Sequence, residues 1–157
     1  MAKPLHLPTS HRTFFATSST WERRPLFRSE RMAKLFREVL LNYRRDGKYL
    51  LHEFVLMPDH FHVLLTLAQA VTIERALQYI KGGFSFRAKS ELGFKGEIWQ
   101  RGFTEHIVGD RNDFELHRGY ILRNPVKAGL AQSPEEYPYC SAYLVTKLDP
   151  PPKAFRG

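Results

Sequence analysis

The chain has 157 residues, about the size of one ordinary domain, and 43% of them are hydrophobic, which is enough to form a buried core. Its formal net charge of +8 favours a polyanionic partner such as nucleic acid. No apolar run approaches the roughly 18 residues of a membrane-spanning helix, so no membrane partner is expected. The single cysteine, Cys140, excludes a disulfide framework and a thiolate zinc site, and it fits a reducing cytoplasm.

The first half of the chain predicts three strands and one helix. Residues 12–19, rich in Thr and aromatic side chains, predict a short strand. Between Ser29 and Gly47 apolar side chains recur every three or four residues, which predicts a helix with Ser29 as its N-cap. Residues 48–57 and 60–67 then predict two strands joined by a tight turn.

The next segment predicts a helix and a strand. Thr72 is the expected N-cap of a helix that reaches about Ser90 and is weakened at Gly82 and Gly83. The stretch 93–108 predicts a strand bounded by glycines.

The last predicted helix resembles one that begins with a capping box, formed by Asn112 and Glu115. It is expected to run through Arg123 and to end because of Pro125. From Ser133 onward the sequence is Pro-rich and predicts irregular structure.

The order of these elements predicts an α+β protein with the ferredoxin-like split βαβ sandwich. Its four-stranded antiparallel sheet would carry two helices on one face, and a C-terminal helix would follow. We expect one domain over residues 1–157, with irregular tails at 1–12 and 145–157. This fold hosts many functions, so it decides none of them.

Two histidines, His60 and His62, stand one residue apart in the apolar segment EFVLMPDHFHVLLTL. Side chains alternate along a strand, so both imidazoles share one face while Phe61 and Val63 share the other. The histidines are expected on the face that the first two helices leave open. Two neutral imidazoles can bind one divalent ion there, although two polar residues on a half-buried strand would give the same pattern.

The last predicted helix adds two further candidates. Tyr120 and Asn124 stand four residues apart and therefore share a helix face. A tyrosine hydroxyl can attack a phosphodiester when a metal polarises the phosphate, and an amide oxygen can complete the metal's ligands. An amphipathic tyrosine and a helix-ending asparagine would look the same. His106, His117 and Glu105 are further candidates for ligands or proton carriers.

Five motifs between about Phe14 and Tyr143 resemble those of the REP-associated tyrosine transposases, bacterial members of the HUH (His, bulky hydrophobic, His) single-tyrosine class. The motifs are VLMPDHFHVLLTL, IKGGFSFRAK, IWQRGFTEHIV, YILRNPVKAGL and SPEEYPYCSAY. The pairing of MPDHFH with NPVKAGL is specific, whereas HxH alone is not. Two departures are mild: Cys140 stands where Ser is expected, and Leu122–Arg123 replaces a more usual histidine-containing pair.

The resemblance implies roles for particular residues. His60 and His62 would ligate Mg²⁺ or Mn²⁺, Asn124 would lie near the metal, and Tyr120 would be the nucleophile. The implied reaction is cleavage and rejoining of single-stranded DNA beside hairpins, through a covalent 5′-phosphotyrosine and a free 3′-OH. The substrate would be nucleoid DNA in a bacterial cytoplasm. Because Mn²⁺ suits imidazole better than Mg²⁺ does, Mn²⁺ is expected to support activity at least as well.

Hairpin DNA binding is expected to use basic side chains that contact phosphates and aromatic side chains that stack on unpaired bases. The basic candidates are Arg12, Arg23, Arg24, Lys81, Arg87, Arg101 and Arg123. A monomer is favoured over a dimer, and Tyr120 must then reach the histidines of its own chain. Two alternatives stay open: a non-catalytic module that binds hairpin DNA or RNA, and a metal-dependent RNA-processing nuclease.

Overall fold

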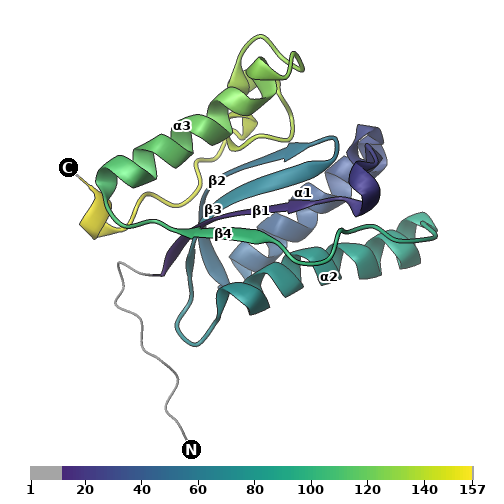
Figure 1. Cartoon of the computed structure of the whole chain (residues 1–157), viewed down its shortest axis with the longest axis horizontal. Coiled ribbons are helices and arrows are strands. Elements are labelled where there is room, and N and C mark those ends of the chain that lie inside the picture. Colours follow the sequence, from purple (N-terminus) through teal and green to yellow (C-terminus); the bar gives the residue numbers. More distant parts are fainter. Residues whose placement is uncertain (1–11, 157) are drawn as a thin grey trace, which may run out of the picture.

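The computed structural model describes residues 12–156, in which helices cover both faces of a four-stranded antiparallel sheet (Figure 1). The sheet order is β2-β3-β1-β4, with strands β1 (Thr13–Ser19), β2 (Tyr49–Met57), β3 (His60–Leu67) and β4 (Thr104–Ile107). The helices are α1 (Glu30–Arg45), α2 (Ile73–Leu92) and α3 (Arg111–Lys127). This arrangement confirms the predicted ferredoxin-like fold with its additional C-terminal helix. None of the helices described is both long and apolar enough to cross a membrane.

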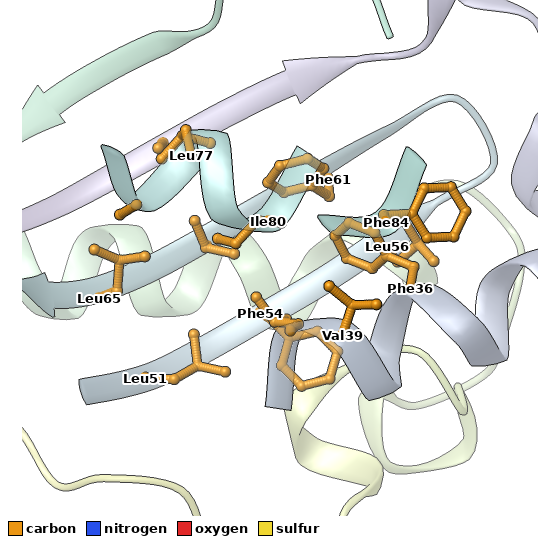
Figure 2. Close-up of a cluster of buried hydrophobic side chains, with 14 of the residues drawn as sticks. Phe36, Val39, Leu51, Phe54, Leu56, Phe61, Leu65, Leu77, Ile80 and Phe84 are labelled. Carbon is orange, nitrogen blue, oxygen red and sulfur yellow. The ribbon is translucent and has the colours of Figure 1, made fainter. Parts of the chain in front are cut away.

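One face of the sheet packs against α1 and α2 and forms the larger hydrophobic core (Figure 2). Phe61 of β3 lies 4.9 Å, between ring centroids, from Phe36 of α1, and Phe84 of α2 packs on the same ring of Phe36. The two helices approach closely at Gly83, where an added Cβ would stand 2.7 Å from the Tyr43 hydroxyl. Gly83 therefore serves close helix packing, and α2 continues through it to Leu92.

The opposite face of the sheet packs against α3 and the C-terminal segment. Its smaller core includes Val55 and Leu64 from the sheet, Phe114 and Ile121 from α3, and Phe155 from the C-terminal segment. Figure 1 shows α3 and the C-terminal segment on this side, across the sheet from α1 and α2. The sheet thus has two buried faces, and the second one carries the histidines of β3.

The ends of the last helix differ from the prediction. Asp110, not Asn112, is the N-cap, because its carboxylate accepts a hydrogen bond of 2.8 Å from the backbone N–H of Asp113. Pro125 does not end the helix. Its ring removes only one backbone donor, and beyond it Ala128 N–H still donates to the Asn124 carbonyl at 3.0 Å, so the helix continues to Lys127.

The strand expected over residues 93–108 is also shorter in the structure, where β4 covers Thr104–Ile107. Gly96 and Gly102 adopt positive φ angles of 100° and 81°, which interrupt an extended strand on its N-terminal side. Between them Trp99 forms only an isolated bridge, and its indole N–H donates to the Lys81 carbonyl at 2.9 Å.

Short 3-10 turns connect the main elements: Trp21–Arg23, Leu26–Arg28, Pro134–Glu136, Ser141–Tyr143 and Lys153–Phe155. The C-terminal segment expected to be an irregular tail packs on the domain. Asp149 accepts two hydrogen bonds from Arg44, at 2.9 and 3.1 Å, and one of 2.8 Å from Leu51 N–H. The N-terminal tail expected at residues 1–12 lies, except for Arg12, outside the described residues.

Candidate active site

His60 and His62 lie on the same face of β3, as strand alternation predicts, with ring centroids 4.9 Å apart. Phe61 between them points into the core on the opposite face. Helix α3 covers the histidine face, so His62 is only 5% exposed. The site therefore lies between the sheet and α3, at the beginning of β3.

Each imidazole is oriented by one hydrogen bond from Nδ1. His62 Nδ1 lies 2.6 Å from the hydroxyl of Thr17, its partner on β1. His60 Nδ1 lies 2.7 Å from Asp59 Oδ1, and Asp59 Oδ2 in turn accepts from Arg23 Nε at 3.2 Å. Such partners fix the orientation and tautomer of metal-binding histidines. In both rings Nε2 is therefore the nitrogen left to bind a metal.

The Nε2 atom of His62 is buried and has no hydrogen-bond partner among residues 12–156. Burial lowers the pKa of His62 to about 3, and the charges of His60 and Arg23 act in the same direction. The ring is therefore neutral at neutral pH. A buried ring nitrogen without a hydrogen-bond partner is costly, and a divalent ion is a suitable partner when that nitrogen carries the lone pair of the neutral ring.

Tyr120 packs against His62. Its ring centroid is 5.2 Å from that of His62 and 5.9 Å from that of Phe15 on β1, yet the residue is 46% exposed. Earlier on α3, His117 packs on Phe15, so the helix progresses from Phe15 toward His62. The next turn carries Asn124, whose side chain forms no hydrogen bond within the described residues. The structure thus brings His60, His62 and Tyr120 together, with Asn124 one turn further along α3.

These donors suit a divalent ion. Two neutral imidazoles and an amide oxygen match the preferences of Mn²⁺ and related metals, and several coordination positions would stay open for phosphate oxygens and water. The unpartnered Nε2 of His62 is the feature of this structure that supports the fit.

A second group of ligand-type side chains lies on the same face of the sheet. His106 of β4 and Asp113 and His117 of α3 offer atoms within 4.8 Å of one another that could hold a metal ion. The sequence had indicated both histidines but not Asp113, because only the fold brings the first turn of α3 beside β4. Glu105, the neighbouring candidate, pairs with Ala16 on β1, whose side chain faces the opposite core.

Several of the basic candidates are already bonded within the protein. The guanidinium of Arg12 donates to the carbonyls of Leu67, Ala68 and Val71. The ammonium of Lys81 donates to the carbonyls of Gln100 and Gly102.

Arg87 forms ion pairs with Glu38 and Glu91, which occupy its guanidinium. The side chains of Arg101 and Arg123 are exposed and form no ion pair within residues 12–156.

Arg23 and Arg24 are exposed at the end of the sheet where β3 begins. Three loops meet there: Thr20 N–H donates to the Asp59 carbonyl, and Gln100 N–H donates to Ser19. The loop that carries Arg101 therefore lies beside the one that carries Arg23 and Arg24.

Comparison with known proteins identifies relatives of this chain. The family described as "Transposase IS200 like" matches residues 14–124. A protein of Haemophilus influenzae assigned as a REP-associated tyrosine transposase is 30% identical over 116 residues, and the match covers 65% of this chain and 64% of that protein. The REP-associated tyrosine transposase of Escherichia coli is 25% identical over 138 residues, covering 83% of this chain and 81% of that protein.

Two solved structures have the same fold. A REP-associated tyrosine transposase bound to a REP hairpin superposes with a TM-score of 0.71 at 25% identity, covering 91% of this chain and 84% of that one. A protein from Deinococcus radiodurans described as a transposase superposes with a TM-score of 0.55 at 17% identity, covering 76% of this chain and 95% of that one. The chain therefore belongs to the IS200-like transposase family, and within it resembles the REP-associated tyrosine transposases.

Proposed function

We propose that this protein is a metal-dependent single-stranded DNA endonuclease and strand transferase that acts at hairpin DNA through a 5′-phosphotyrosine intermediate. The observation that carries the proposal is the position of Tyr120, whose half-exposed ring lies 5.2 Å from the ring of His62, a histidine with a buried Nε2 that has no partner among the described residues. Family membership supports the same reaction class.

The residues have distinct tasks in this reaction. His60 and His62, together with Asn124, would hold a divalent ion. Its positive charge would polarise the scissile phosphate and stabilise the leaving 3′ oxygen. Tyr120 Oη forms the new bond to phosphorus while the bond from phosphorus to the 3′ oxygen breaks. The phenol proton passes to water at the exposed side of Tyr120, and the departing 3′ oxygen takes up a proton. The phosphotyrosine ester keeps the 5′ end attached for rejoining.

The proposed substrate is hairpin DNA with an adjacent single strand. A structural relative is bound to a REP hairpin, and the net charge of +8 suits a polyanion. The exposed arginines nearest to the proposed active site are Arg23 and Arg24, with Arg101 on the adjoining loop. We assign phosphate contacts to these three residues and to Arg123, because all four side chains are exposed, whereas Arg12, Lys81 and Arg87 are half-buried.

We also propose that a monomer carries a complete site. His60, His62 and Tyr120 lie together within one chain, so no second chain is needed to supply the tyrosine.

Incubation with labelled single-stranded hairpin DNA tests the proposed reaction. The protein is expected to form a denaturant-resistant DNA adduct with Mn²⁺ or Mg²⁺, and none after chelation. Tyr120→Phe removes only the hydroxyl and is expected to abolish the adduct while hairpin affinity changes by less than about twofold. Tyr143→Phe, which alters another half-exposed tyrosine, is the matched control and should form the adduct normally.

Hairpin binding without any adduct under either metal would overturn the catalytic proposal and leave a binding module. Cleavage of RNA but not of DNA hairpins would favour an RNA-processing nuclease instead.

A further inference from the structure

We propose that His106, Asp113 and His117 form a second divalent-cation site, separate from His60 and His62 and suited to Zn²⁺. The three side chains come from two elements, His106 from β4 and the other two from the first half of α3. His106 Nε2 lies 2.7 Å from Asp113 Oδ2, and His117 Nδ1 lies 2.9 Å from both Asp113 Oδ1 and the Asp113 backbone carbonyl oxygen. Metal bonds of about 2 Å place neighbouring ligand atoms roughly 3 Å apart, so small movements would accommodate an ion.

The position of the carboxylate is fixed by its own contacts. Asp113 Oδ2 accepts a hydrogen bond of 3.0 Å from Gly109 N–H, and the N-cap Asp110 holds the Asp113 backbone. Partial burial would raise the pKa of Asp113, but the bonds from Gly109 and His106 lower it below its ordinary value. The carboxylate is therefore ionised at neutral pH.

The imidazole rings are also arranged for joint binding. The rings of His106 and His117 are stacked, with centroids 4.6 Å apart and an angle of 25° between their planes. The side chain of His106 is 48% exposed, which gives an ion access from solvent. Two imidazoles and one carboxylate form a typical three-residue set for zinc, with open positions left for water.

This group cannot share one ion with the histidines of β3. His62 lies on β3 and His106 on β4, and β1 runs between these strands. Two strand spacings amount to roughly 10 Å, far beyond the span of the ligands of a single ion. Phe15 of β1 fills the space between them, because its ring packs on both His62 and His117.

An ion at this site would join β4 to α3 one turn before Tyr120. His117 precedes Tyr120 by three residues on the same helix, so the tyrosine helix would gain a fixed attachment to the sheet edge. The site itself follows from geometry alone and does not depend on the nuclease proposal.

Titration of the protein with Co²⁺ tests the site, because bound Co²⁺ is detected by its visible absorption. Zn²⁺ is then added to displace the bound Co²⁺. The protein should carry no polyhistidine tag, and His60→Ala with His62→Ala removes the other proposed site. We expect this double variant to bind one equivalent of Co²⁺ and to release it when Zn²⁺ is added. Adding His106→Gln or His117→Gln should weaken binding at least about tenfold, since even loss of indirect metal partners costs 10–100-fold.

Glu115→Gln in the same background is the matched control, because Glu115 is an exposed acidic residue of α3 outside the group. It should leave Co²⁺ binding unchanged. Circular dichroism shows whether each variant is folded. The proposal is overturned if the folded double variant binds no Co²⁺, or if it binds Co²⁺ equally well after His106→Gln and His117→Gln. Neither result would bear on DNA cleavage, because that reaction is assigned to other residues.

Discussion

At the scale of single residues, the two ring nitrogens of His62 have different surroundings. Nδ1 meets the Thr17 hydroxyl at 2.6 Å, whereas Nε2 is buried without a partner among the described residues. His60 is held in a similar way by Asp59, which is itself paired with Arg23. We therefore expect Asp59 to be a positioning residue, since it would act on the proposed metal through His60.

Removing the Asp59 carboxylate is expected to weaken metal binding without unfolding the protein. Asp59→Ala frees the His60 ring to rotate, so Mn²⁺ affinity should fall about 10–100-fold. Asp59→Asn keeps an oxygen that can accept from Nδ1, so it should retain most of the affinity. The measurement is titration of free Mn²⁺ by electron paramagnetic resonance, in a His117→Gln background that disables the second proposed site. If the Asp59→Ala variant bound Mn²⁺ as tightly as the protein that keeps Asp59, in the same His117→Gln background, this role would be contradicted.

At the scale of elements, the position of Tyr120 depends on how α3 is fastened to the sheet. Arg118 Nε lies 3.2 Å from Glu53 Oε2 of β2, and Ser141 donates to the same carboxylate at 2.5 Å. Burial raises the pKa of Glu53, while Ser141 and Arg118 oppose that rise. Loss of Arg118 would leave this buried carboxylate without its cation.

Arg118→Met is expected to lower the free energy of unfolding by about 1–3 kcal/mol at neutral pH, because it strands a largely buried carboxylate. Without Arg118 the folded-state pKa of Glu53 rises further above its unfolded value. The deficit is then full above that folded pKa and shrinks as the pH falls through it and Glu53 takes up a proton. Urea unfolding at neutral and mildly acid pH measures both effects.

Arg123→Met, which removes an exposed arginine from the same helix, is the control and should change stability by less than about 0.5 kcal/mol. A deficit for Arg118→Met that is absent, or that does not vary with pH, would show that the Glu53 pair does not fasten α3.

The elements also show which features the sequence can predict. Periodicity and capping residues placed α1, α2 and the hairpin of β2 and β3, and strand alternation placed both histidines on one face. The predicted start of α3 was wrong, because the N-cap is Asp110 and not Asn112. The strand predicted over residues 93–108 was too long, because the apolar residues around Trp99 pack into the core without pairing as a strand.

Side-chain partners that are distant in sequence could not be predicted. The pairing of Thr17 with His62 depends on the register between β1 and β3, which no local pattern specifies. The contact of Asp149 with Arg44 spans 105 residues and requires the complete fold. Asp113 joins His106 only because α3 returns over the sheet.

At the scale of the whole molecule, one chain supplies every residue assigned to the reaction. β3 provides the histidines and α3 provides Tyr120 from the same chain, on one side of the sheet (Figure 1). In this structure Tyr120 of α3 contacts His62 of β3 within one chain. The arrangement therefore does not require a dimer in which α3 of one chain completes the site of the other.

Mixing two inactive variants tests this arrangement. Tyr120→Phe lacks the proposed nucleophile, and the His60→Ala, His62→Ala double variant lacks the proposed metal ligands. Because the proposed site is complete within one chain, the mixture should form no more DNA adduct than either variant alone. Adduct formation restored by mixing would show that active sites are shared between chains.

Peptide mapping of the covalent adduct tests the central claim most directly. After reaction with hairpin DNA and Mn²⁺, the adduct is digested with nuclease and protease, and mass spectrometry locates the attached nucleotide. The nucleotide should be found on Tyr120 alone, bound through its 5′ phosphate. A nucleotide on Tyr79 or Tyr143, or its attachment through a 3′ phosphate, would contradict the proposed mechanism.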